Sequence, residues 1–185
     1  MILPIVAYGD PVLRKVAVDI TKTYPDLEKL IADMFETMEK SKGVGLAAPQ
    51  VSKSIRLFVI DSSRMYDEDE KNEGVREVFI NAQMLDETGK EWPYEEGCLS
   101  IPTIRDDVYR NEKIKIEYLD ADFKKHVKEF KGLTARVIQH EYDHIEGKLF
   151  IDHLKPLTRA LLKGKLEKIS KGIVDVDYKM RFPKK

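Results

Sequence analysis

The chain alternates between stretches whose apolar residues recur with helical spacing and stretches whose apolar residues are contiguous or alternate with polar ones. Over residues 26–42, apolar side chains recur at intervals of three and four, which predicts an amphipathic helix that Gly43 would end. The spacing predicts a second helix over 133–146, ended by Gly147, and a third that begins near Pro156.

Short apolar runs and alternating segments predict strands. We place these strands at residues 56–61, 77–81, 113–119 and 125–131. The last two are expected to pair as a hairpin, because polar residues 120–122 separate them. Residues 148–152 are expected to be extended, and the charged stretch 67–74 to be a solvated loop. The whole pattern predicts an α+β fold, in which the helix over 133–146 packs against mixed or antiparallel β-sheets, with one helix on its N-terminal side and one on its C-terminal side.

Composition narrows the class of protein. The 185 residues are 42% hydrophobic and 35% charged, which is typical of a globular protein that buries a core. Without a repeat or linker, we expect one catalytic domain over 1–185, with a core over 1–155 and a basic helix and tail over 156–185.

The net charge of −1 gives no overall field that attracts DNA, and no apolar run approaches the roughly 18 residues of a membrane span. The short apolar start lacks the features of a signal peptide, and the single cysteine suits a reducing compartment, so we expect a cytoplasmic protein.

The segment His140-Glu141-Tyr142-Asp143-His144 carries the chemistry that the sequence shows most clearly. Side chains four apart share one face of a helix, so His140 and His144 can reach the same divalent metal. Glu141 lies about 100° further round the helix, where it can reach a water bound to that metal. Leu133 and Val137 lie on the same stripe as the histidines, which places the expected site at the edge of the core. This pattern indicates metal-assisted hydrolysis.

The third ligand is open to alternatives. One zinc-protease pattern needs a histidine at position 150, where this chain has Phe150. Glu167 would complete a peptidase site, although its predicted helix face is strongly charged. Cys98 offers a thiolate that suits Zn²⁺ or Fe²⁺, and its neighbours Gly97 and Pro102 favour a shaped loop over a central strand. A lone cysteine is more often a small buried hydrophobe, and a non-catalytic metal-binding or peptide-binding module is a further alternative.

Three blocks of the sequence together resemble the peptide deformylase family. They cover residues 43–50, 96–100 and 139–144, and they occur in the family's order with similar spacing. Residues 8–14 are also similar, so that the resemblance extends from about residue 3 to 155. It implies hydrolytic removal of the N-formyl group from the N-terminal formylmethionine of newly made polypeptides, with release of formate. N-Formylmethionyl nascent peptides are therefore the expected partners, in the cytoplasm of a bacterium.

The resemblance also implies roles for particular residues. Cys98, His140 and His144 would hold one divalent metal with water as the fourth ligand, Fe²⁺ in vivo and Zn²⁺ or Ni²⁺ as alternatives in purified protein. Glu141 would act as general base, while the Gln50 amide and the Leu99 backbone N–H would stabilise the oxyanion. The residues expected to bind substrate are Val44, Gly45, Leu46, Gly97, Leu133, Arg136 and Val137.

Other charged residues have two interpretations each. Arg136 either lies near the mouth of the substrate pocket or is solvated, and Asp143 either orients a ligand histidine or faces water. We expect Arg105 to pair with Glu96, and His126 and His153 not to be ligands. The basic face of the last helix is either simply solvated or docks on the ribosome near the exit tunnel, as some members of the family do. That face comprises Lys155, Arg159, Lys163, Lys165 and Lys168.

Overall fold

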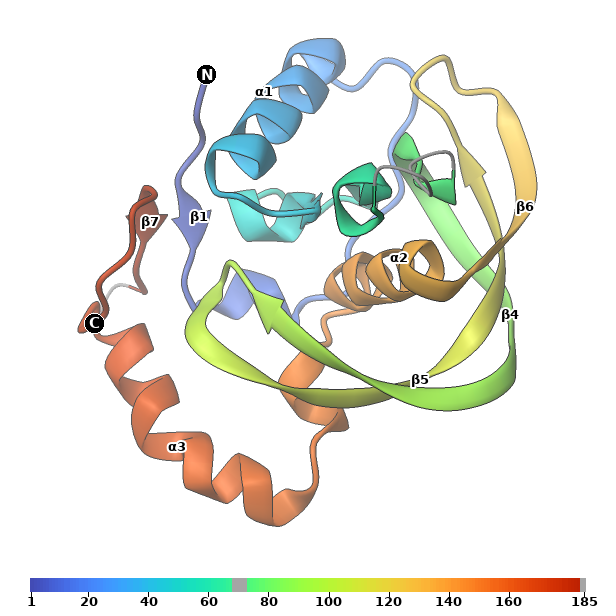
Figure 1. Ribbon diagram of the computed structural model, residues 1–185. Helices are drawn as coiled ribbons and strands as arrows, with labels where there is room; N and C mark the ends of the chain where they lie inside the picture. Colours follow the sequence, from blue (N-terminus) through green and yellow to red (C-terminus); the bar gives the residue numbers. More distant parts are fainter. Residues whose placement is uncertain (68–72, 184–185) are drawn as a thin grey trace.

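The computed structural model describes residues 1–67 and 73–183 (Figure 1). The helices are α1 (Leu27–Lys40), α2 (Gly132–Ile145) and α3 (Pro156–Ser170), with 3-10 helices η1 (Pro11–Arg14), η2 (Ala48–Val51), η3 (Ser62–Met65) and η5 (Phe150–His153). The strands are β1 (Ile5–Val6), β2 (Gly45–Ala47), β3 (Leu57–Asp61), β4 (Arg76–Cys98), β5 (Ile101–Leu119), β6 (Lys125–Lys131) and β7 (Met180–Arg181). The expected α+β class is confirmed, with α1 and α3 before and after the central helix.

Five strands form an antiparallel sheet in the order β2-β3-β4-β5-β6. Strands β4 and β5 have 23 and 19 residues, and in Figure 1 they curve around α2. Their pairing register shifts at several points, and such bulges bend a sheet and increase its twist. A separate parallel pair joins β7 to β1, so that the C-terminal segment lies beside the start of the chain.

Helix α2 lies inside this curved sheet, and its apolar side is fully buried. Ala135, Ile138 and Ile145 pack in a cluster with Phe58 and Phe79 from the sheet. The helix also buries polar or charged side chains, among them Arg136, Gln139, Glu141, Asp143 and His144. Such burial is unusual, because a charged group is stable in the interior only when it is paired. A core helix with so many buried polar groups is the natural place for a functional site.

The structure corrects several predictions about the elements. The strands predicted at 77–81 and 113–119 are only parts of β4 and β5, because the arms of these strands are polar and largely exposed on one face. Residues 150–153 form η5, whereas we predicted an extended segment over 148–152. Cys98 is the last residue of β4, and the shaped loop that we predicted around it is only the link Leu99–Ser100 before β5 begins. Of the predicted loop 67–74, residues 68–72 lie outside the described residues.

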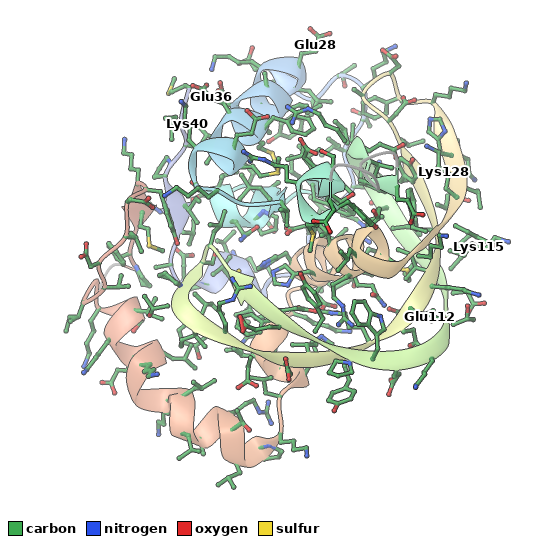
Figure 2. The ribbon with its side chains drawn as sticks, viewed as in Figure 1. Glu28, Glu36, Lys40, Glu112, Lys115 and Lys128 are labelled. Atoms are coloured by element: carbon green, nitrogen blue, oxygen red, sulfur yellow. The ribbon has the colours of Figure 1, made fainter. Side chains whose placement is uncertain are left out.

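The outer surface is strongly charged. Figure 2 shows the labelled side chains of α1 and of the β5–β6 hairpin pointing away from the core, among them Glu28, Lys40 and Lys115. Helix α3 lies at the periphery and buries only Leu166 and Ile169. Within the described part of the chain, no helix combines the length and apolarity that crossing a membrane requires.

Candidate active site

Three potential metal ligands converge where the end of β4 meets α2. One ligand atom each from Cys98, His140 and His144 lies within 4.8 Å of the other two, and Cys98 Sγ lies 3.3 Å from His144 Nε2. Helical spacing brings the two imidazoles together, with ring centroids 5.2 Å apart. Ligands of a tetrahedral site with Zn–S of ~2.3 Å and Zn–N of ~2.0 Å lie about 3.5 Å apart. The arrangement therefore fits a divalent metal.

The surroundings of Cys98 favour the ionised form of its thiol. Burial raises its pKa, but the neighbouring His144 and His140 outweigh burial and lower the pKa to about 5. A thiolate is the form that binds metals. By contrast Glu167, the alternative third ligand, is exposed on α3 and pairs with Lys171 at 2.5 Å. The structure thus brings Cys98, and not Glu167, to the histidines.

A buried carboxylate orients His140 from behind. Glu96 Oε2 lies 2.9 Å from His140 Nδ1, which leaves Nε2 free to face the other ligands. Arg110 donates from Nε and Nη2 to the two carboxylate oxygens at 2.7 and 3.1 Å, and Arg136 Nη1 donates to Oε1 at 3.1 Å. Burial opposes ionisation of Glu96, yet His140 and Arg110 hold its pKa far below the usual range.

The predicted Arg105–Glu96 pair is wrong, because the Arg105 side chain is exposed and pairs with Glu95 at 2.5 Å.

Asp143 extends this network instead of serving a ligand directly. Its Oδ2 accepts from Arg110 Nη1 at 2.8 Å and lies 2.7 Å from His153 Nε2. Neither interpretation of Asp143 from the sequence is therefore right, since among the described residues its carboxylate makes no hydrogen bond to His140 or His144, and it is buried. His153 and His126 both lie outside the ligand group, and His126 pairs with Asp120.

Glu141 is 4% exposed and lies against the backbone of β2. A Cβ at Gly45 would lie 2.7 Å from Cγ and Cδ of Glu141, so only glycine leaves room for the carboxylate. Among the described residues Glu141 Oε2 has no hydrogen-bond partner. Burial disfavours the charged form and raises the pKa of Glu141 to about 7. A carboxyl group whose pKa lies near neutrality is suited to general acid–base catalysis.

Gln50 approaches the site from η2. Its Oε1 accepts from the Ala47 N–H at 2.9 Å, and this bond directs Nε2 towards Cys98 Sγ at 3.5 Å and Ser100 Oγ at 3.3 Å. Gln50 is 1% exposed, so that its amide is held in one orientation. Leu99 directly follows the cysteine in the link between β4 and β5. Both residues named for oxyanion stabilisation thus lie beside the ligand group.

A cavity of about 580 Å³ opens in front of these groups. Of the residues expected to bind metal, act in catalysis or bind substrate, it is lined by Val44, Gly45, Gln50, Gly97, Cys98, Leu99, Arg136, Val137, His140 and Glu141. Leu46 is not brought to it, because its side chain is fully buried in the cluster with Met34 and Met38. Leu133 instead lines a separate surface depression with Tyr66 and Trp92.

Arg136 lies at the wall of the cavity but is not solvated. It is 2% exposed, stacks on the Trp92 ring at 4.6 Å, and donates to the carbonyls of Trp92 and Val108. Sequence reasoning missed further lining residues, notably Met65, Tyr94 and Tyr178. None of these three belongs to a motif, and only Tyr94 is close in sequence to a recognised block.

Comparison with known proteins agrees with the geometry. The family model described as "Polypeptide deformylase" matches residues 2–160. A peptide deformylase of Cytophaga hutchinsonii is 63% identical over 183 residues, which cover 99% of this chain and 98% of the relative. Another from Flavobacterium psychrophilum is 55% identical, with 100% of both chains covered.

Solved structures are similar as well. The crystal structure of a peptide deformylase from Legionella pneumophila has a TM-score of 0.79 at 39% identity and covers 94% of this chain and 98% of its own. The peptide deformylase from Thermus thermophilus gives a TM-score of 0.82 at 37% identity, covering 93% of this chain and 99% of its own. The chain therefore belongs to the peptide deformylase family, the metal-dependent hydrolases that remove the N-formyl group from the N-terminal formylmethionine of newly synthesised polypeptides and release formate.

Proposed function

We propose that Cys98, His140 and His144 hold one divalent metal, Fe²⁺ in vivo, and that the residues around them hydrolyse the formyl amide. The convergence of the three ligand atoms beside the buried Glu141 carries this proposal. A mixed set of one thiolate and two imidazoles accepts Fe²⁺, Zn²⁺ and Ni²⁺, and Fe²⁺ is the metal that the family implies. The bound metal supplies Lewis acidity and lowers the pKa of a water molecule.

Glu141 takes a proton from the attacking water and returns it to the departing amine nitrogen. Water oxygen adds to the formyl carbon, the carbon–nitrogen bond breaks, and formate leaves a free α-amino group on the peptide. Gln50 Nε2 and the Leu99 N–H donate to the oxygen that becomes negatively charged. One such donor typically lowers the activation barrier by about 3–4 kcal/mol.

The substrate peptide lies along β2 in this proposal. Strand β2 is at the edge of the sheet and, within residues 1–67 and 73–183, pairs only with β3, so that an extended peptide can add beside Gly45. Val44 and Val137 contribute apolar surface for the methionine side chain, with Gly97 and the stacked Arg136 at the wall. The side chains of Leu46 and Leu133 take no part, because they lie away from the cavity.

The test begins with anaerobic purification, metal analysis and a formate-release assay on an N-formylmethionyl peptide. Cys98→Ala should lose the metal, whereas Glu141→Ala should retain metal and peptide binding but lose formate release. Glu167→Ala is the matched control and should keep both metal and activity. Metal retention in Cys98→Ala together with metal loss in Glu167→Ala would establish the alternative ligand set. A protein that binds Fe²⁺ or Ni²⁺ yet releases no formate would be a binding module.

We further propose that residues 1–185 act as one catalytic domain in the bacterial cytoplasm, with the core over 1–155 and the basic helix and tail over 156–185. Helix α3 would dock on the ribosome, because Leu157 and Leu161 are 74% and 76% exposed beside its basic side chains. Charge reversal of Lys163 and Lys168 should abolish a salt-dependent ribosome affinity, whereas Lys115→Glu on β5 should not. Binding that is absent or independent of salt would leave α3 as a solvated helix.

A further inference from the structure

The segment that follows α3 returns to the active site. Its strand β7 pairs in parallel with β1, with Ile5 opposite Met180 and Val6 opposite Arg181. Just before β7, Asp177 Oδ2 pairs with Lys42 Nζ at 2.5 Å, near the end of α1. The match to the family model ends at residue 160, so this segment lies outside the matched residues.

Tyr178 is the residue of this segment that reaches the cavity. It lines the same cavity as Glu141 and Gln50 and packs, together with Leu99, against the core cluster beneath α1. Its hydroxyl donates to the Leu99 carbonyl at 2.8 Å. A tyrosine held by packing at one end and by a hydrogen bond at the other restrains the group that it contacts.

The Leu99–Ser100 link is a two-residue turn between β4 and β5, enclosed by the pair Cys98–Ile101. Its two carbonyls are held from outside the hairpin: the Tyr8 N–H donates to the Ser100 carbonyl at 2.8 Å, and the Tyr178 hydroxyl donates to that of Leu99. The position of the link therefore depends on contacts from both ends of the chain.

We propose that Tyr178 is a positioning residue for deformylation, acting by holding the Leu99 carbonyl and thereby the direction of the Leu99 N–H. This inference rests on the proposed function, in which that N–H donates to the oxyanion. Such a donor stabilises the transition state only when its direction is fixed before the reaction. Loss of the tyrosine hydroxyl frees the Leu99 carbonyl to turn. Because the two-residue turn is closed at both ends by the Cys98–Ile101 pair, a rotation of this peptide plane must be compensated by the preceding one, which carries the Leu99 N–H.

The experiment compares Tyr178→Phe, Tyr178→Ala and, as a matched control, Tyr109→Phe on the exposed face of β5. Formate release gives kcat and KM, thermal melts give Tm, and the amide chemical shift of Ser100 reports on the Leu99 carbonyl, because both belong to one peptide bond. Tyr178→Phe should lower kcat about fivefold, the factor for one net hydrogen bond, with KM unchanged, Tm lowered by only about 2–4 °C and the Ser100 amide shifted. Tyr178→Ala should lower both kcat and Tm.

The outcomes separate the two proposals. An unmutated enzyme that releases no formate would refute the proposed function itself. If it is active and Tyr178→Phe matches it in kcat, the positioning role is wrong, even if Tyr178→Ala loses activity through instability. An increase in KM without a fall in kcat would also refute positioning, because it would make Tyr178 a substrate contact. Tyr109→Phe should change none of these measurements.

Discussion

Substitution of Gly45 offers a sharp test of how the carboxylate of Glu141, the proposed general base, is placed. In Gly45→Ala the new Cβ would lie 2.7 Å from Cγ and Cδ of Glu141. Non-bonded carbon atoms pack at about 3.5–4.0 Å, so the Glu141 side chain must move by roughly 1 Å. A misplacement of that size in a reacting group can cost about 100-fold in rate. We therefore expect kcat/KM for formate release to fall about 100-fold, with one metal still bound because none of the three ligands is touched.

The matched control is Gly164→Ala on α3, where an added Cβ meets no atom within 4 Å. Alanine in a helix interior is about 1 kcal/mol more favourable than glycine, so this variant should melt at a higher temperature with unchanged activity. Gly45→Ala should lower Tm by a few degrees, because overpacking costs about 1–3 kcal/mol. Full activity of Gly45→Ala, with Glu141 still required, would refute the close contact and the placement of the base that follows from it.

Three other substitutions probe the groups around the ligands. Glu96→Gln removes the buried charge that orients His140 and should weaken metal affinity by about 10–100-fold, measured by competition with a chelator; unchanged affinity would contradict the orienting role. Arg110→Met leaves the carboxylates of Glu96 and Asp143 undercompensated and should destabilise the fold by roughly 3–5 kcal/mol in denaturant unfolding; a loss below about 1 kcal/mol would show that Arg136 and His153 suffice. Gln50→Ala should lower kcat by about 100–1,000-fold with KM nearly unchanged, since its amide acts only on the developing charge; a change confined to KM would make Gln50 a substrate-binding residue.

The helices were the most predictable part of the fold, because each carries a periodic apolar stripe. The expected 26–42 became α1 at Leu27–Lys40, and 133–146 became α2 at Gly132–Ile145. The arms of β4 and β5 were missed because they run past the core. From Asp86 to Glu91 every residue of β4 is exposed and none is a large apolar residue, so this stretch carries no apolar signal that marks a strand.

The site was predictable only where local spacing encodes it. His140 and His144 are brought together by one helix, whereas Cys98 needed the resemblance to a family, because nothing local fixes which strand end meets α2. Tyr178 gave no signal at all, since its contact is a hydroxyl on a backbone carbonyl of a residue 79 positions away. Such a contact requires a particular side chain at only one of the two positions, because the backbone carbonyl of any residue can accept the hydrogen bond.

The buried arginines show why composition misleads near such a site. Arginine is normally exposed, so a solvated Arg136 was a reasonable expectation from sequence. Here Arg110 and Arg136 are 6% and 2% exposed, and their two charges balance the carboxylates of Glu96 and Asp143. Burial lowers the pKa of His140, but Cys98 and Glu96 together raise it well above the usual value. By sharing the charge of Glu96, the arginines limit this rise, which favours the neutral imidazole that the proposed metal site requires. The buried arginines thus keep Glu96 ionised although it is inaccessible to water, which leaves its carboxylate able to orient His140.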